Sequence, residues 1–188
     1  MTEREKMLAG MLYNVSGDQD LVDERNRCKD LCYDFNQLRP SDKNGQTEIM
    51  KKILGKTSSL FKIRASFWCL YGFNIEIGDN FYMNHNCVIM DAAKVIFGSN
   101  VFIAPGCGFH TVNHSIDLHE RISGLEYAKP ITVGDGVWFG AGAQVMPGVT
   151  IGIGAVIGAG SIVTRDIPAN VVAVGNPCRV IREISQKN

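Results

Sequence analysis

The sequence of 188 residues contains no apolar run close to the roughly 18 residues that a membrane-spanning helix needs. Its N-terminus does not show the charged and then apolar pattern of a secretion signal. Neither sign of charge dominates, because 19 Lys and Arg residues balance 19 Asp and Glu residues. These absences predict a soluble, cytoplasmic protein that binds neither a membrane nor nucleic acid.

Metal and nucleotide motifs are missing as well. Cys28 and Cys32 share one face of an expected helix, but no histidine or further cysteine pair completes a zinc pattern around them. The glycine spacings in GAGAQ and IGIGAVIGAG lack the following helix of a dinucleotide fingerprint, and there is no Walker sequence. We therefore expect structural thiols rather than disulfides, and no metal cofactor.

A six-residue repeat is what the sequence does contain. Between Val133 and Ile167 a large apolar residue recurs every six residues, and glycine mostly follows it. Neither the period of a helix nor that of a strand produces this spacing. A solenoid does, because each hexapeptide forms one short strand and one turn, and stacked coils bury the repeated side chain. The repeated positions are Val133, Phe139, Val145, Ile151, Ile157 and Val163.

The same period continues upstream in two further frames, which are separated by two extra residues. The segment 110–130 fits no frame and is polar. A loop of about twenty residues is uncommon in a compact domain and is usually functional. The upstream positions are Ile77, Met83 and Ile89 in one frame and Phe97, Ile103 and Phe109 in the other.

Three regions follow from these patterns. Residues 1–60 are expected to be helical, since Thr2 and Glu5 form a capping-box pattern and apolar residues share one face of a second helix. Residues 61–168 form the solenoid, interrupted by the loop 110–130. Residues 169–188 add a short strand and a basic tail.

Longer segments carry more specific information than the repeat. These are MLAGMLY, YGFNIEIGDNFYMNHNCVIMD, NH at 113–114, KPITVGDGVWFGAGAQVMPGVTIG and IPANVVAVGNPCRVIREI. Together they resemble the maltose/galactoside O-acetyltransferases, hexapeptide-repeat enzymes related to the nodulation acetyltransferases. The resemblance covers almost the whole chain. It implies a mainly β fold, a left-handed parallel β-helix with coils of about eighteen residues. It also implies a homotrimer with active sites between subunits, and acetyl-CoA as co-substrate without a metal.

The resemblance also assigns candidate catalytic residues. His114, in the expected active-site loop 110–130, matches the family's catalytic histidine. This base takes a proton from a sugar hydroxyl that attacks the thioester of acetyl-CoA, a task that suits an imidazole with an unperturbed pKa of about 6.5. Asn84 matches an asparagine that donates a hydrogen bond to the developing oxyanion. On the residues alone, the competing candidates for the base are His85, His110 and His119.

The expected acceptor site is also taken from the resemblance. Tyr82, Asn84 and Asp91 are expected to lie beside the acceptor, together with Asp18, for which Asn14 is an alternative. The chain departs from the family's usual residues at three positions, which alters the expected acceptor contacts and the loop. The departures are Leu70 in place of a polar residue, Ala92 in place of an acid and Ser115 in place of proline.

Coenzyme A is long and carries an anionic 3′-phosphate at one end. Its site needs a groove with basic residues, and guanidinium groups pair with phosphate through two hydrogen bonds. By the resemblance, small residues leave space for the pantetheine arm, and Trp138 forms a cleft wall or, alternatively, fills the core. The expected site contains Asn84, Trp138, Ala141, Ala159, Thr164, Arg165, Arg179 and Arg182.

Two classes of function remain open. The first is an acetyl-CoA-dependent acetyltransferase that transfers the acetyl group directly to a sugar hydroxyl of the maltose, glucose or galactoside class. A xenobiotic or other small-molecule hydroxyl or amine is the alternative acceptor. The second class is a non-catalytic hexapeptide scaffold. The joint presence of His114, Asn84 and the basic tail favours the enzyme, because a scaffold needs none of them.

Overall fold

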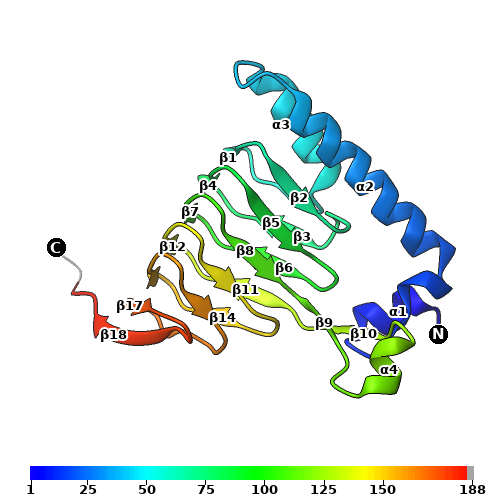
Figure 1. Ribbon diagram of the computed structural model, residues 1–188. Coiled ribbons are helices and arrows are strands. Elements are labelled where there is room, and N and C mark those ends of the chain that lie inside the picture. Colours follow the sequence, from blue (N-terminus) through cyan, green and yellow to red (C-terminus); the bar gives the residue numbers. More distant parts are fainter. Residues whose placement is uncertain (186–188) are drawn as a thin grey trace.

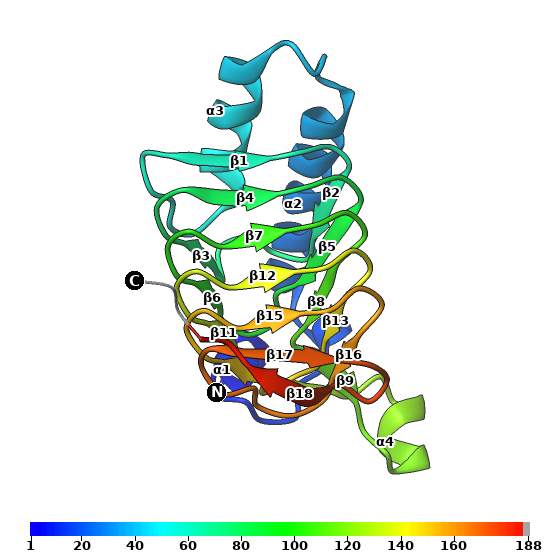
Figure 2. The same ribbon diagram turned by 90° about the vertical axis from the view of Figure 1, so that its left-hand side faces the viewer.

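The computed structural model describes residues 1–185, which form a β-solenoid with helices at its N-terminal end (Figure 1). Short strands lie one above another in successive coils, as the hexapeptide period predicts (Figure 2). Within the described range, no helix is both long enough and apolar enough to span a membrane.

The N-terminal helices begin at capping side chains. The Thr2 hydroxyl accepts a hydrogen bond from the Glu5 N–H, and the Glu5 carboxylate accepts one from the Thr2 N–H, so the predicted capping box is confirmed. Asp42 caps the third helix by accepting from the Gly45 N–H, so that helix begins at Lys43. The helices are α1 (Glu3–Leu8), the 3₁₀ helix η1 (Val15–Gly17), α2 (Gln19–Gln37) and α3 (Lys43–Ile53).

Three sheets form the sides of the solenoid, and all their strands pair in parallel except β18 (Arg179–Glu183), which is antiparallel to β17 (Val171–Val174). The seven-stranded sheet has the order β1 (Phe61–Ile63), β4 (Phe81–Met83), β7 (Phe102–Ile103), β12 (Trp138–Phe139), β15 (Val156–Ile157), β17 and β18. The five-stranded sheet has the order β16 (Ile162–Val163), β13 (Gln144–Val145), β8 (Gly108–His110), β5 (Cys87–Met90) and β2 (Phe67–Cys69). The four-stranded sheet has the order β14 (Thr150–Ile151), β11 (Ile131–Val133), β6 (Val95–Phe97) and β3 (Ile75–Ile77).

The coils are not all of the same length. Trp138 pairs with Val156, an offset of 18 residues that agrees with the expected coil. Lys62 pairs with Tyr82, an offset of 20, so the expected coil length is wrong for the first coils. The two extra residues widen one corner, and there Tyr71 and Ala92 pack against the N-terminal segment in a second apolar cluster. The wider corner therefore provides the surface on which the chain's beginning is held. That segment contributes Met7, Tyr13, Val15 and Leu21.

The interior of the solenoid is filled by the repeated large residues. Phe97 meets Phe109 edge-on with ring centroids 4.9 Å apart, and Phe109 meets Phe139 in the same way at 5.1 Å. Phe81 continues the stack, 5.2 Å from Phe97. Edge-to-face aromatic pairs of this kind add stability beyond the area that they bury. The stack runs along the solenoid axis and ties successive coils together.

The segment 110–130 has more secondary structure than a loop without a repeat would suggest. β9 (Val112–His114) and β10 (Glu126–Ala128) form an antiparallel pair, and α4 (Leu118–Ile122) lies between them. Asp117 begins α4, because its carboxylate accepts from the N–H groups of His119 and Glu120. Figure 2 shows this arm projecting from one corner of the solenoid.

The C-terminal region ends on a strand that turns back. β17 continues the parallel stack on β15, and β18 pairs with β17 antiparallel. Residues 186–188 of the expected basic tail lie outside the described residues.

Candidate active site

One hollow on the seven-stranded sheet gathers several of the residues expected at the active site. Tyr82, Phe102 and Trp138 are direct neighbours in register on β4, β7 and β12, so their side chains form one outward row. Phe102 is 44% exposed and Trp138 is 53% exposed, which places Trp138 on the surface and not in the core. With Asn84, Ile103 and Ala104 the row lines a cavity of about 450 Å³. An aromatic surface beside a small cavity suits the face of a sugar ring or the arm of a coenzyme.

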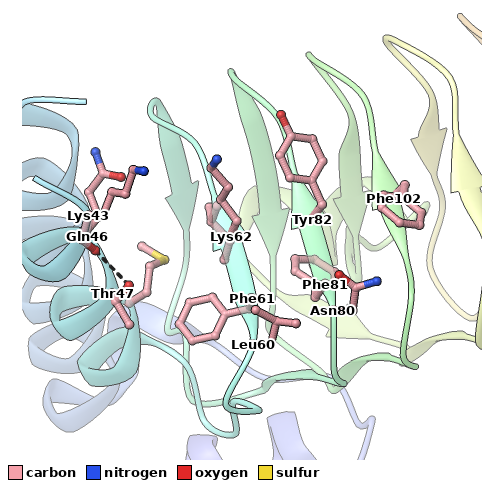
Figure 3. Close-up of a pocket in the computed structure, with 12 residues that line it drawn as sticks. Lys43, Gln46, Thr47, Leu60, Phe61, Lys62, Asn80, Phe81, Tyr82 and Phe102 are labelled. Carbon is pink, nitrogen blue, oxygen red and sulfur yellow. Dashed lines mark hydrogen bonds between the residues drawn. The ribbon is translucent and has the colours of Figure 1, made fainter. Parts of the chain in front are cut away.

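A second cavity continues this hollow toward the N-terminal end. It measures about 350 Å³ and shares Tyr82 and Phe102 with the first cavity. Figure 3 shows Lys62 in the same row as Tyr82 and Phe102, with Leu60 and Phe61 below and α3 at the side. The two cavities adjoin at these shared residues and are together called the groove, whose N-terminal part is lined by apolar residues and by polar ones that include Lys43 and Lys62.

Asn84 follows β4 at the corner of the solenoid, and local bonds fix its orientation. Its backbone N–H donates to the Ile103 carbonyl at 2.9 Å. Its side-chain Oδ1 accepts from the His85 N–H at 2.8 Å. The side-chain NH₂ group makes no hydrogen bond within residues 1–185, so it is the part of the amide that can donate to a ligand. A side-chain amide with an available N–H is one of the groups that can stabilise an oxyanion.

His114 lies at the end of β9, on the β9–β10 arm, and not on the sheet that carries the aromatic row. Its side chain is 56% exposed, and its Nε2 lies 3.9 Å from Oε1 of Glu126 on the paired strand β10. The other oxygen of Glu126 accepts from the Tyr13 hydroxyl at 3.0 Å. Burial, and next the Glu126 charge, raise the pKa of Tyr13, so this hydroxyl stays protonated and keeps donating. A held carboxylate beside His114 can stabilise an imidazolium.

Glu126 and Tyr13 are not among the residues that the sequence singled out. They are 113 positions apart, and they meet because Tyr13 forms a bridge with Glu126 at the edge of β10. No local sequence motif predicts a contact between residues that lie so far apart in the chain. The other histidines have different partners. His110 bonds Gln144 at 2.8 Å, the ring of His85 bonds the Ala65 carbonyl, and among residues 1–185 only His114 lies within ion-pair distance of a carboxylate.

The structure does not bring His114 and Asn84 together within one chain. Asn84 lies at the corner beyond β4, while His114 is on the β9–β10 arm, and the two regions are separated in both views (Figures 1 and 2). None of the residues that line the cavity around Asn84 comes from the arm. One described chain therefore holds His114 and Asn84 in two separate places.

Two residues expected at the acceptor site are occupied by structural contacts. Asp91 is fully buried, and its Oδ1 accepts from the N–H groups of Leu70 and Tyr71, both at 2.9 Å. We expected Asp91 to contact the acceptor, but within this chain it is buried and instead supports the backbone of the wider corner from inside. Burial raises the pKa of its carboxyl from 3.8 to about 7, although the backbone donors oppose this.

Asp18 is the second of these residues. It caps α2 through Oδ1, which accepts from the Leu21 N–H, and its Oδ2 accepts from the Arg4 N–H. The alternative, Asn14, donates from Nδ2 to the Ser123 carbonyl and so joins the N-terminus to the arm. Both side chains therefore hold the N-terminal segment against its neighbours.

The residues expected to bind coenzyme A lie in three places. Ala141 and Ala159 occupy equivalent positions in stacked turns beside the aromatic row, where the Gly160 N–H donates to the Ala141 carbonyl. Thr164 and Arg165 follow β16 at a different corner of the solenoid, and both are exposed. Arg179 and Arg182 are exposed on β18. Arg182 pairs with Val172, which extends the row of Trp138 through Val156, so the aromatic row ends at an arginine.

Two known sequence families match separate segments of this chain. Residues 6–58 match the maltose acetyltransferase hexapeptide capping motif. Residues 130–165 match the bacterial transferase hexapeptide family, with six repeats. The first match covers the N-terminal helices and the second covers the regular part of the solenoid.

Individual relatives extend over the whole chain. A candidate acetyltransferase of Saccharomyces cerevisiae is 50% identical over 184 residues, which cover 98% of this chain and 94% of the relative. The crystal structure of a maltose O-acetyltransferase from Clostridium difficile has a TM-score of 0.96, with 44% identity and 99% of each chain covered. A galactoside acetyltransferase in complex with coenzyme A has a TM-score of 0.94 and 42% identity, with 98% of this chain and 92% of that chain covered.

Proposed function

This chain belongs to the maltose/galactoside O-acetyltransferase family of hexapeptide-repeat acyltransferases, and we propose that it transfers the acetyl group of acetyl-CoA to a sugar hydroxyl. The observation that carries the proposal is the pair of half-sites, an exposed histidine backed by a carboxylate and an asparagine amide facing an aromatic-lined cavity. A non-catalytic scaffold needs neither.

The proposed reaction is a direct transfer. His114 takes the proton of the acceptor hydroxyl, whose oxygen forms a bond to the carbonyl carbon of the thioester. Glu126 stabilises the imidazolium that results, and the Asn84 NH₂ group donates to the oxygen that becomes negative. The carbon–sulfur bond then breaks, and the proton passes from His114 to the leaving thiolate. The products are an acetyl ester and coenzyme A.

The two half-sites are completed by a second copy of the chain. We place His114 of one subunit against Asn84 of its neighbour in a homotrimer of left-handed solenoids, with three equivalent sites. The proposal is supported by the separation of the two residues in one chain and by the exposed aromatic row beside Asn84 (Figure 1). A closed ring uses each surface once and leaves none unpaired.

The donor is proposed to lie along the corner beside the aromatic row. Ala141 and Ala159 leave room for the pantetheine arm, and arginines at the C-terminal end pair with the phosphates. Because Thr164 and Arg165 are at another corner, they reach the coenzyme held by the neighbouring subunit. Residues 1–60 then cap the solenoid of 61–168, and residues 169–185 close the donor site.

One observation favours a different acceptor. Leu70 is apolar where the family usually has a polar residue, and it is only partly buried against the second apolar cluster. A less polar hydroxyl compound, or an amine, is the second candidate for this reason.

The test is an acceptor screen with acetyl-CoA. Wild-type protein is incubated with maltose, glucose, galactosides and a set of non-sugar alcohols and amines, and free thiol and acetylated product are measured. We expect thiol release matched by acetyl-sugar formation.

The variant His114→Ala should lower kcat by about 10²–10⁴-fold with little change in coenzyme A affinity. His119→Ala, in the same arm, serves as the control. Turnover near wild type in His114→Ala would remove the base from the mechanism.

A further inference from the structure

Three cysteines from distant parts of the sequence meet beneath α2. Cys28 and Cys32 are one helical turn apart, and Cys69 ends β2 on the sheet below. The sulfur of Cys69 lies 3.3 Å from that of Cys28 and 3.7 Å from that of Cys32. All three sulfurs lie within 4.8 Å of one another. Three soft donor atoms thus converge on one point.

The surroundings of this three-sulfur cluster are closed. Cys28 is 1% exposed, Cys32 is not exposed and Cys69 is 5% exposed. The Asp91 carboxyl group interacts electrostatically with Cys28 and Cys69. Its Oδ2 is buried and makes no hydrogen bond within the described part of the chain.

We propose that Cys28, Cys32 and Cys69 form a binding site for a soft, monovalent metal ion of the Cu(I) type. The site lies between α2 and the first coil, away from the groove and the arm that form the catalytic half-sites. It is therefore independent of the acetyl-transfer proposal.

The number of available sulfur ligands, three, favours Cu(I) over zinc. Soft sulfur ligands favour Cu(I) and zinc among biological metals. Structural zinc takes four ligands, and no other His, Cys, Asp or Glu of residues 1–185 joins the three sulfurs at the same close mutual distance. Cu(I) accepts three sulfurs as its complete set of ligands.

The geometry needs little change to accept an ion. With metal–sulfur bonds of about 2.3 Å, three sulfurs in a plane around the ion are about 4 Å apart. The sulfurs at 3.3 and 3.7 Å would then move apart by about 0.7 and 0.3 Å, which side-chain rotation supplies. Binding releases thiol protons, and the bound ion links α2 to β2.

The experiment uses the full-length protein, reduced and stripped of metal under anaerobic conditions. Cu(I) is titrated in competition with a coloured Cu(I) chelator, and X-ray absorption at the copper edge counts the ligands. We expect one ion per chain, three sulfur neighbours, and a higher melting temperature for the loaded protein. Cys69→Ser should weaken binding by more than about 100-fold.

The matched control is Cys107→Ser. Cys107 is also buried and has only one thiol neighbour, Cys87, so this variant should bind Cu(I) as wild type does. If Cys69→Ser fails to fold, as judged by circular dichroism, Cys28→Ser and Cys32→Ser replace it, and the ligand count on wild type decides by itself.

Three outcomes overturn the proposal. They are a wild-type protein that cannot compete with the chelator, a sulfur count of two that disappears in Cys107→Ser, and displacement of the bound Cu(I) by equimolar zinc. The last would assign the cluster to a four-coordinate ion with a ligand recruited by rearrangement.

Discussion

Different kinds of contact hold Asn84 and His114 in the candidate site. Asn84 is oriented by a bond from the next backbone N–H, which is local and does not depend on distant parts of the chain. His114 depends on the arm, on Glu126 from the paired strand and on Tyr13 from the N-terminus. The position of His114, the proposed base, is therefore sensitive to changes far from it in sequence, whereas the position of Asn84, the proposed oxyanion donor, is not.

Arg179 permits a test of donor binding that needs no knowledge of the acceptor. If it pairs with a phosphate, Arg179→Ala should weaken coenzyme A binding by about 1.5–3 kcal/mol, the size of a charge-assisted hydrogen bond. Calorimetry measures the affinity, and it should fall with added salt. Arg27→Ala, an exposed arginine paired with Glu24 on α2, is the control. No binding by wild type at millimolar coenzyme A would refute the donor site.

Asp91 gives the protein a pH-dependent stability. Its folded pKa of about 7 lies above its ordinary 3.8, so between these values the folded chain holds a proton that the unfolded chain has lost. The stabilising contribution is complete below pH 3.8 and is lost as the pH rises through 7. Asp91→Asn, which cannot ionise, should therefore become more stable relative to wild type on going from pH 5 to pH 8.

Denaturant unfolding of metal-free protein at several pH values measures this difference. Asp79→Asn, at an exposed corner, is the control. A constant difference between Asp91→Asn and wild type from pH 5 to pH 8 would show that the buried carboxyl does not titrate in that range.

At the scale of elements, the solenoid depends on a continuous interior stack rather than on the length of any strand. Many strands have only two residues, which is too few to be stable alone. Their stability comes from stacking on the coils above and below, as expected for repeat architectures. The phenylalanines of the stack are the largest side chains in that interior.

Phe109 is the test of this stack. Its ring is fully buried between Phe97 and Phe139, so Phe109→Ala should reduce the free energy of unfolding by about 3–5 kcal/mol. Tyr33→Ala removes an exposed ring from α2 and should change it by less than about 0.5 kcal/mol. Chemical denaturation followed by circular dichroism compares the two. A similar small loss in both variants would mean that coil stacking does not depend on the aromatic interior.

At the scale of the whole molecule, the two half-sites lie on different surfaces of one chain. The groove with Asn84 is on the seven-stranded sheet, and the arm with His114 projects from another corner (Figure 2). Assembly then decides whether a complete site exists. We expect a trimer in analytical ultracentrifugation, with three identical junctions.

Mixed trimers separate a shared site from a site within one chain. His114→Ala and Asn84→Ala chains are unfolded together and refolded in equal amounts, with each variant refolded alone as control. Mixed trimers each hold one junction with both residues intact, so about a quarter of wild-type activity should return. Activity no higher than the sum of the two separate variants, or a fully active monomer, would contradict the shared site.

The sequence by itself determined the repeating part of the fold. A hexad of large apolar residues is a local pattern repeated many times, and only stacked coils bury every copy, so the solenoid follows from Val133 to Ile167 and its upstream frames. The capping box at Thr2 is equally local. His114 stood out because it interrupts the repeat, although its role came from the family resemblance.

Contacts between distant segments were decided only by the tertiary structure. Cys69 is 41 positions from Cys28, and Glu126 is 113 positions from Tyr13, so no spacing in the sequence relates the members of either pair. The burial of Asp91 depends likewise on the wider corner of the first coils and on the N-terminal segment packed there. Such contacts arise where a non-repeating segment folds back on the solenoid. Their geometry depends on the packing of surfaces, and a periodic pattern carries no information about it.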